Sequence, residues 1–206
     1  MALQPSLSPL IVAGILPAPH TLDIFLDYVC PFSAKMASTI DTILKPLLDE
    51  GGQYYGKVKV IVRLQVQPWH ASSTLTHEAG LAVIRAAAEQ FWPFSILLFQ
   101  NQTDYFDVPT SEMTPIQIRD KLAILASQVL TNDEVKTFRD LLKLKGSANG
   151  GVAVTDDLKY NIKFARQNSV HVSPTVLWNG LVASQISSSW GEQEWTNFLA
   201  ENVGNS

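Results

Sequence analysis

The stretch LDYVCPFSAKM, residues 26–36, contains the only cysteine of this 206-residue chain. Apolar, strand-like residues precede Cys30, and the residues from Pro31 onward are arranged as in a helix. The position three residues after the cysteine, where a second thiol would be the obvious partner, is Ser33. The chain therefore carries one thiol at the junction between a strand and a helix, and it forms no internal disulfide.

The segments on both sides of this junction predict a βαβ unit. Residues 21–29, TLDIFLDYV, have the branched and aromatic composition of a strand. Apolar residues then recur at helical spacing over 36–48, before a pair of glycines that begins at Gly51. Strict alternation of apolar residues in KVKVIVRLQVQ, residues 57–67, predicts a second strand. In this order, the two strands are expected to be parallel and their crossover right-handed.

The middle of the chain, from residue 72 to about 147, predicts a block of helices. Helical patterns cover residues 76–91, 114–130 and 131–146. Capping boxes open the last two of these helices, Thr114 with Gln117 and Thr131 with Glu134. The aromatic cluster of Phe91, Trp92, Phe94 and Phe99 is expected to form the core of this block.

The C-terminal part of the chain returns to mixed structure. A helix is expected from Thr155, as its cap, to about Asn168. SPTVLWNG, residues 173–180, predicts a strand that enters a turn, with LVASQIS as its hairpin partner. Ser189 and Glu192 are expected to form the capping box of a last helix.

The position of Cys30 has a chemical consequence if the helix begins at Pro31. Unpaired backbone N–H groups and the positive end of the helix dipole favour a thiolate there, and the thiolate is the nucleophilic form. Ser33, one turn later, is expected to direct its hydroxyl toward the sulfur. The alternative is that Cys30 is an inert core residue, since free cysteine is among the most buried residue types.

A second motif, VSPT, residues 172–175, favours the functional interpretation. Pro174 stands at the mouth of a predicted strand, where a cis proline presents a backbone edge, although an edge-strand proline is an alternative. Together with CPFS at residues 30–33 and the helical insertion between the motifs, it makes the chain resemble the DsbA-like superfamily of thioredoxin-fold proteins. That group includes DsbA-type oxidoreductases, kappa-class glutathione transferases and 2-hydroxychromene-2-carboxylate isomerases.

The resemblance covers roughly residues 20–204 and implies an α/β fold made of thioredoxin βαβ and ββα halves with an inserted all-helical subdomain. The corresponding boundaries are residues 20–71 and 152–206 for the thioredoxin-like domain and 72–151 for the insertion.

The resemblance also assigns roles to individual residues. Cys30 matches the family's nucleophilic cysteine, Ser33 replaces the resolving cysteine, and Pro31 and Phe32 lie between them in the motif that meets the substrate. Pro174 matches the cis proline that faces the thiol, and the backbone of Ser173 matches the edge that pairs with substrate or glutathione. Asp27, three residues before Cys30, resembles the aspartate that the transferase and isomerase branches have at this position. Ile24, six residues before Cys30, stands where dithiol members of the family often have a buried acidic residue.

Ser33 narrows the expected chemistry, because a dithiol protein releases its mixed disulfide through the second cysteine. We therefore expect a single-thiol oxidoreductase or transferase that uses glutathione as a cosubstrate and holds no tightly bound cofactor. One alternative is a non-catalytic module that binds an extended peptide or a small apolar ligand. Another is a glutathione-dependent isomerase or transferase in which Ser33 and Asp27 polarise bound glutathione and Cys30 is not the nucleophile.

Residues after the second strand are candidates for the same site, because ligands bind beyond the carboxyl ends of parallel strands. Gln67, Trp69 and His70 follow that strand, so Trp69 and His70 are candidate substrate-binding residues. The alternative is that Trp69 packs beneath the helices and that His70 is a solvated turn residue. No metal site is expected, since His70 and His77 lack paired ligand spacing with Cys30.

Composition limits the partners. The formal net charge is −4 and no basic stripe is interleaved with aromatic residues, so nucleic acid is not expected. No apolar run has the roughly 18 residues of a membrane span, and LIVAGIL near the N-terminus lacks the basic region of a signal peptide. We expect a cytoplasmic protein whose partners are glutathione or an extended peptide or disulfide substrate. Because relatives in the transferase branch of the family are dimers, a homodimer is also an expectation.

Overall fold

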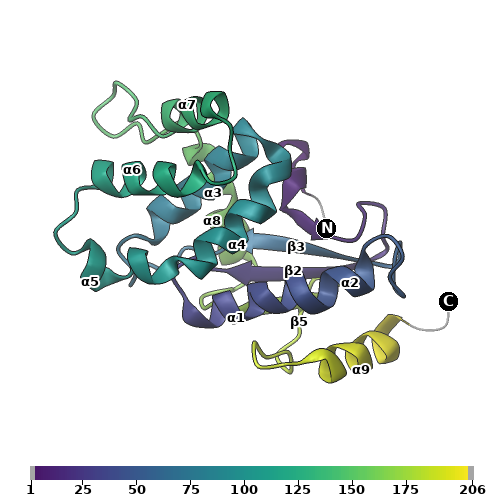
Figure 1. Ribbon diagram of the computed structural model, residues 1–206. Coiled ribbons are helices and arrows are strands. Elements are labelled where there is room, and N and C mark those ends of the chain that lie inside the picture. The colour runs from purple at the N-terminus through teal and green to yellow at the C-terminus, as the bar shows by residue number, and fades with distance from the viewer. Residues whose placement is uncertain (1–2, 204–206) are drawn as a thin grey trace.

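A five-stranded sheet with the strand order β1-β3-β2-β4-β5 forms the centre of the computed structural model, which describes residues 3–203 (Figure 1). The strands are β1 (Ile11–Ala13), β2 (His20–Leu26), β3 (Val58–Leu64), β4 (Thr175–Trp178) and β5 (Leu181–Val182). β2 and β3 are parallel over seven residue pairs, and the other neighbouring strands are antiparallel. The fold is thus α/β with the expected thioredoxin-like arrangement.

The predicted βαβ unit is confirmed. Between β2 and β3 the chain forms α1 (Pro31–Thr39), a π-helical turn (Ile40–Leu44) and α2 (Lys45–Leu48). Gly51 adopts a φ of 89° after α2, a conformation that favours glycine and turns the chain toward β3. This crossover places the start of α1 at the same edge of the sheet as the end of β3.

The strand β1 and the 3₁₀ helix before it (Pro5–Leu10) are elements that the sequence analysis did not predict. β1 pairs antiparallel with β3, with Ile11 opposite Ile61, and so extends the sheet on that side. Leu7 and Leu10 are buried in the main hydrophobic cluster.

The helical block contains α3 (Ser73–Ala86), α4 (Phe91–Gln100), α5 (Asp107–Thr110), α6 (Pro115–Ala126) and α7 (Asn132–Leu141). Both predicted capping boxes are present, with reciprocal hydrogen bonds between Thr114 and Gln117 and between Thr131 and Glu134. The expectation of one helix over 76–91 was wrong. Helix α3 ends at Ala86 because Ala87 has a φ of −157°, and a 3₁₀ turn leads into α4 at Phe91.

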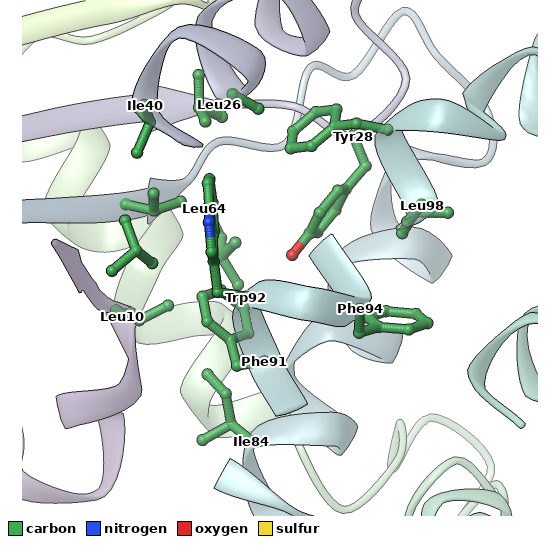
Figure 2. Packing of buried hydrophobic residues seen from close by; sticks show 14 of the residues in the cluster. Leu10, Leu26, Tyr28, Ile40, Leu64, Ile84, Phe91, Trp92, Phe94 and Leu98 are labelled. Carbon is green, nitrogen blue, oxygen red and sulfur yellow. The ribbon is translucent and has the colours of Figure 1, made fainter. Parts of the chain in front are cut away.

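Figure 2 shows how α4 packs: Trp92 lies beside Leu64 of β3, Phe91 lies near Ile84 of α3, and Phe94 points away from these residues. The aromatic residues predicted as a core are buried, and they belong to the same hydrophobic cluster as the sheet. The helical block and the thioredoxin-like part therefore share one continuous core.

The C-terminal elements are α8 (Thr155–Gln167), the hairpin of β4 and β5, and α9 (Glu192–Val203). Two predicted caps differ from the structure. Val154 is the N-cap of α8, while the Thr155 hydroxyl accepts a hydrogen bond from Val152 N–H. The side chain of Glu194, not a pair of Ser189 and Glu192, accepts from Gly191 N–H before α9.

Helix α8 covers one face of the sheet, and α1, α2 and α9 lie on the other (Figure 1). On the α8 side, Phe25 and Leu177 pack against Ala165 and Val170. The same face also buries an ion pair, in which Arg63 Nε donates to Asp23 Oδ1 at 2.7 Å. The face toward α1 is mainly aliphatic, with Leu22, Ile24 and Leu26 of β2 buried, and the opposite face holds the buried charge pair.

Candidate active site

Cys30 is the N-cap residue of α1, with extended backbone angles of −98° and 121°. Its carbonyl oxygen accepts the first helical hydrogen bonds, from Ser33 N–H at 3.0 Å and Ala34 N–H at 3.1 Å. Pro31 occupies the first helical position, where a missing N–H donor is harmless. The residue is 5% exposed, so the thiol lies just below the surface at the N-terminal, positive end of the helix dipole.

The thiol faces the loop before β4, which comes from the other end of the chain. The peptide bond between Ser173 and Pro174 is cis, as the second motif predicted. Cys30 Sγ lies 3.5 Å from the carbonyl oxygen of Ser173 and donates a hydrogen bond to it. The Ser173 hydroxyl is buried and has no hydrogen-bond partner within residues 3–203.

Ser33 does not have the contact that the sequence analysis assigned to it. The side chain is fully buried, and its Oγ accepts a hydrogen bond from Asp27 N–H at 3.1 Å. Among residues 3–203 no hydrogen bond joins Ser33 Oγ to Cys30 Sγ. The expectation failed because the end of β2 turns back over the first turn of α1 and presents a backbone donor to this hydroxyl.

Asp27 joins three segments through one fully buried carboxylate. Oδ1 accepts from Val29 N–H at 3.0 Å, and Oδ2 accepts from Gln67 N–H at 3.0 Å and from Ser73 Oγ at 2.9 Å. Three donors stabilise a buried carboxylate and occupy its strongest acceptor positions. Asp27 therefore holds the segments of Val29, Gln67 and Ser73 together from within the core. The expectation that Asp27 contacts a ligand was wrong, because its side chain, like that of Ser33, is fully buried and cannot reach bound glutathione.

Gln67 has a role in the site that its position alone did not reveal. The sequence analysis placed it near Cys30, at the end of β3, without assigning a function. Its side-chain Oε1 accepts a hydrogen bond from the backbone N–H of Ser173 at 3.0 Å. The two backbone groups of Ser173 are thus bonded within the chain, the N–H to Gln67 and the carbonyl to Cys30.

The turn around Cys30 is also held from the helical block. Gln102 Nε2 donates to the carbonyl oxygens of Tyr28 and Cys30, at 2.9 Å and 3.3 Å. The Tyr28 hydroxyl lies 2.7 Å from Ser95 Oγ of α4, and burial raises the pKa of this phenol well above its usual range, which keeps it protonated. A side chain at Gly80 of α3 would meet the Tyr28 hydroxyl at 2.7 Å, so a glycine is needed for this packing.

Phe32, Trp69 and Val172 are exposed apolar residues on segments that border the thiol. Phe32 follows Cys30 by two residues, Val172 precedes Ser173, and Trp69 comes two residues after Gln67. Trp69 does not pack beneath the helices, which removes the structural alternative considered for it. These three side chains give the surface around the thiol an apolar character.

The histidines do not converge on the thiol. His70 Nδ1 is 3.9 Å from Asp107 Oδ2 of α5, and its backbone belongs to the turn after β3, in agreement with the alternative of a solvated turn residue. His77 is buried in α3 with its ring nitrogens beside the carbonyl oxygens of Ser73 and Leu26. Within residues 3–203, no three His, Cys, Asp or Glu side chains are grouped as a metal site would require.

The described part of the chain contains no helix that is long and apolar enough to span a membrane.

Solved structures of similar fold include thiol-disulfide oxidoreductases. A protein proposed to be a protein-disulfide isomerase from Pseudomonas syringae is 26% identical, with a TM-score of 0.71 over 91% of this chain and 96% of that one. The thiol-disulfide oxidoreductase MdbA from Corynebacterium diphtheriae is 18% identical, with a TM-score of 0.62 over 94% and 91%. Oxidised BdbD from Bacillus subtilis is 16% identical, with a TM-score of 0.61 over 93% and 91%.

No curated protein matches the chain in sequence. The family model described as thioredoxin, however, matches residues 8–198, which include β1 to β5, the helical block and both motifs of the site. With a cysteine at the start of α1, a cis proline opposite it and helices inserted between them, the chain belongs to the thioredoxin family and has the architecture of its DsbA-like members.

Proposed function

We propose that this protein is a thiol-disulfide oxidoreductase that works with one thiol, Cys30, and uses glutathione as the second. The observation that carries the proposal is the 3.5 Å contact between Cys30 Sγ and the carbonyl oxygen of Ser173, next to the cis peptide bond. It holds the only thiol against the one backbone edge in the fold where a substrate sulfur would arrive. The likeness to structures described as thiol-disulfide oxidoreductases supports the same class of reaction.

The reaction has two exchange steps. The Cys30 thiolate attacks one sulfur of a substrate disulfide, so that a Cys30–substrate disulfide forms while the other substrate sulfur leaves as a thiolate and takes a proton from solvent. The thiolate of glutathione then attacks the substrate sulfur of this mixed disulfide and releases the Cys30 thiolate. The net change exchanges one thiol partner of the substrate disulfide for glutathione. Glutathione itself is abundant in a reducing compartment such as the cytoplasm, where we place the protein.

Phe32, Trp69 and Val172 define the proposed substrate surface. An extended peptide laid along Ser173 would place side chains against these exposed apolar groups, while its backbone pairs with the edge next to Pro174. Pairing requires a rearrangement, because Gln67 Oε1 already accepts from Ser173 N–H. We infer that a substrate carbonyl replaces the Gln67 side chain at this donor.

Mass spectrometry after incubation with oxidised glutathione tests the proposal. Wild type is expected to gain one glutathione on Cys30 and to lose it on addition of reduced glutathione. The Cys30→Ser variant serves as the control without a thiol, and Ser33→Ala keeps the thiol and is expected to form the adduct. Failure of the folded wild type to form the adduct, or adduct formation without turnover of any glutathione-containing or peptide disulfide, would remove the proposed activity.

A second candidate, a non-catalytic peptide-binding module, is favoured by one observation. Both backbone groups of Ser173 are engaged internally and Cys30 is 95% buried, an arrangement in which the thiol serves as a structural donor. Binding of an extended peptide that is equally strong in wild type and Cys30→Ser, together with an unreactive wild-type thiol, would support this module over the oxidoreductase.

A further inference from the structure

A cavity of about 690 Å³ opens between α6 and α7, in a part of the molecule that contributes nothing to the thiol site. Its apolar lining comes from Ile116 of α6, from Val135 and Phe138 of α7, and from Leu142 and Leu144 just after α7. In Figure 1 these two helices lie on the outer side of the helical block, away from α1. The volume falls in the range of roughly 300–1,000 Å³ that small-molecule sites occupy.

The cavity has a closed apolar floor and an apolar mouth. Phe138 is fully buried and Leu142 nearly so, whereas Ile116 and Leu144 are 63% and 64% exposed. A ligand that covers these two aliphatic side chains would remove apolar area from solvent, which favours binding. Ile124, on the same helix and 65% exposed, does not line the cavity.

The charges at the cavity carry a positive excess, although the whole chain has a net charge of −4. Three of its four cationic side chains are neutralised by carboxylates: Arg119 by Glu78, Arg139 by Asp120 and Lys143 by Asp140. The fourth, Lys136, forms no ion pair or hydrogen bond through its ammonium group within residues 3–203 and is attracted at longer range by Asp140, whose carboxylate already pairs with Lys143. The four cations exceed the three carboxylates by one, so an anion at the mouth would meet a net positive charge next to exposed aliphatic side chains.

We propose that this cavity binds an amphipathic carboxylate of the fatty-acid type. The hydrocarbon chain lies against Ile116, Val135 and Phe138, and the carboxylate remains at the mouth beside Lys136. The apolar floor favours the hydrocarbon chain, and the excess of one positive charge favours an anionic head group over a neutral one. The site is independent of Cys30 and of the proposed oxidoreductase activity, since no residue is common to the two sites.

Calorimetric titration with decanoate, below the concentration at which it forms micelles, tests the proposal, with 1-decanol as the neutral ligand of equal chain length. Saturable binding of decanoate at one site per chain is expected. Lys136→Gln is expected to weaken decanoate binding about two- to five-fold, as for an exposed ion pair, and to leave decanol binding unchanged. Ile116→Ala is expected to weaken both ligands about three- to ten-fold through lost apolar contact.

Matched variants outside the cavity separate the site from general effects. Ile124→Ala removes an equally exposed side chain from the same helix, and Lys163→Gln removes an exposed lysine from α8; neither is expected to change binding. The proposal is overturned if decanoate does not bind saturably, if Lys136→Gln and Ile116→Ala bind it as wild type does, or if only vesicles of anionic phospholipid bind, which would assign the charge to a membrane surface. Circular dichroism of each variant verifies that it is folded.

Discussion

The side chain of Gln67 and the backbone of Ser173, 106 residues apart, are joined by a hydrogen bond of 3.0 Å from Ser173 N–H to Gln67 Oε1. In the proposed function, this donor is the group with which an incoming peptide strand would pair. The amide of Gln67 therefore occupies the position of a substrate carbonyl, and it also holds the loop of Pro174 against Cys30.

Gln67→Ala is expected to have opposite effects on stability and on substrate binding. The partly buried N–H of Ser173 loses its acceptor, which should lower the free energy of unfolding by about 1 kcal/mol. The same N–H becomes available to a peptide, so the KM for a peptide disulfide should fall. Urea denaturation and steady-state kinetics measure the two effects. Gln65→Ala, a change at a buried glutamine of the same segment, should leave KM unchanged; an unchanged KM in Gln67→Ala would contradict the assigned role.

Asp27→Asn should destabilise the protein although the shape of the side chain is kept. An amide nitrogen replaces one carboxylate oxygen, and it then faces a donor: Val29 N–H, or Gln67 N–H together with Ser73 Oγ. One or two buried donors lose their acceptor, at a cost of about 1–3 kcal/mol. Ser73→Ala removes one donor and leaves the carboxylate satisfied by the other two, so its loss of stability in urea denaturation should be smaller. Equal stability of Asp27→Asn and wild type would refute the buried network.

Ser33→Cys should convert the single-thiol site into one that resolves its own mixed disulfide. The new thiol lies one helical turn from Cys30, and it is expected to displace glutathione and form an intramolecular disulfide. Sulfur is a weak acceptor, so the hydrogen bond from Asp27 N–H weakens and stability should fall by about 1 kcal/mol. Mass spectrometry after treatment with oxidised glutathione should show loss of the glutathione adduct in Ser33→Cys and its retention in Ser33→Ala. Persistence of the adduct in Ser33→Cys would mean that the two sulfurs do not meet.

Trp69→Ala should weaken the binding of peptide substrates with little effect on folding, because the side chain is exposed beside the site. The expected rise in KM for a peptide disulfide is about five- to tenfold, from the loss of an aromatic contact surface. Leu181→Ala, at an exposed apolar residue on the opposite part of the sheet, provides the comparison and should have no effect. The kinetic measurement contradicts the proposed substrate surface if both variants behave alike.

The buried pair of Asp23 and Arg63 should make stability depend on pH. Burial raises the pKa of Asp23 above 3.8, and Arg63 partly opposes this rise. The Asp23 carboxyl group therefore binds its proton more tightly in the folded protein than in the unfolded chain. As the pH rises from 3.8 through the pKa of Asp23 in the folded state, the contribution of Asp23 to the free energy of unfolding falls. Arg63→Met removes the opposing charge, raises that pKa further and should cost about 3–5 kcal/mol near neutral pH.

Urea denaturation of Arg63→Met at about pH 4.5 and about pH 7.5 measures this effect, with the larger loss expected at the higher pH. The double variant Asp23→Leu, Arg63→Met buries no charge and should recover most of the stability, without the added pH dependence. A loss in Arg63→Met that is the same at both pH values would show that Asp23 does not become the unpaired charge.

The parts of the fold that depend on local patterns were predictable from the sequence. The alternation of β3, the periodicity after Phe32 and the capping boxes of α6 and α7 are each encoded in a short window, and the structure contains all of them. The cis bond before Pro174 was expected from the resemblance to the DsbA-like superfamily, since the position at the mouth of a strand alone also allowed an edge-strand proline.

The contacts within the site were not predictable in the same way. Asp27 accepts from Gln67 and Ser73, 40 and 46 residues away, and no local pattern indicates that these donors meet one carboxylate. Ser33 illustrates the consequence: its spacing from Cys30 favoured a bond to sulfur, but the nearer donor is the backbone of Asp27. The break at Ala87 was missed because helix-forming residues continue through it.

The contact between Cys30 and Ser173 spans 143 residues of sequence. During synthesis, the thiol leaves the ribosome long before the loop that covers it has been made, and domains of this kind complete their long-range contacts only when the later strands are available. A nascent chain therefore carries Cys30 uncovered through most of its translation. The low exposure of this sulfur is a property of the finished chain, and oxidants present during biosynthesis meet a more accessible thiol than those present afterwards.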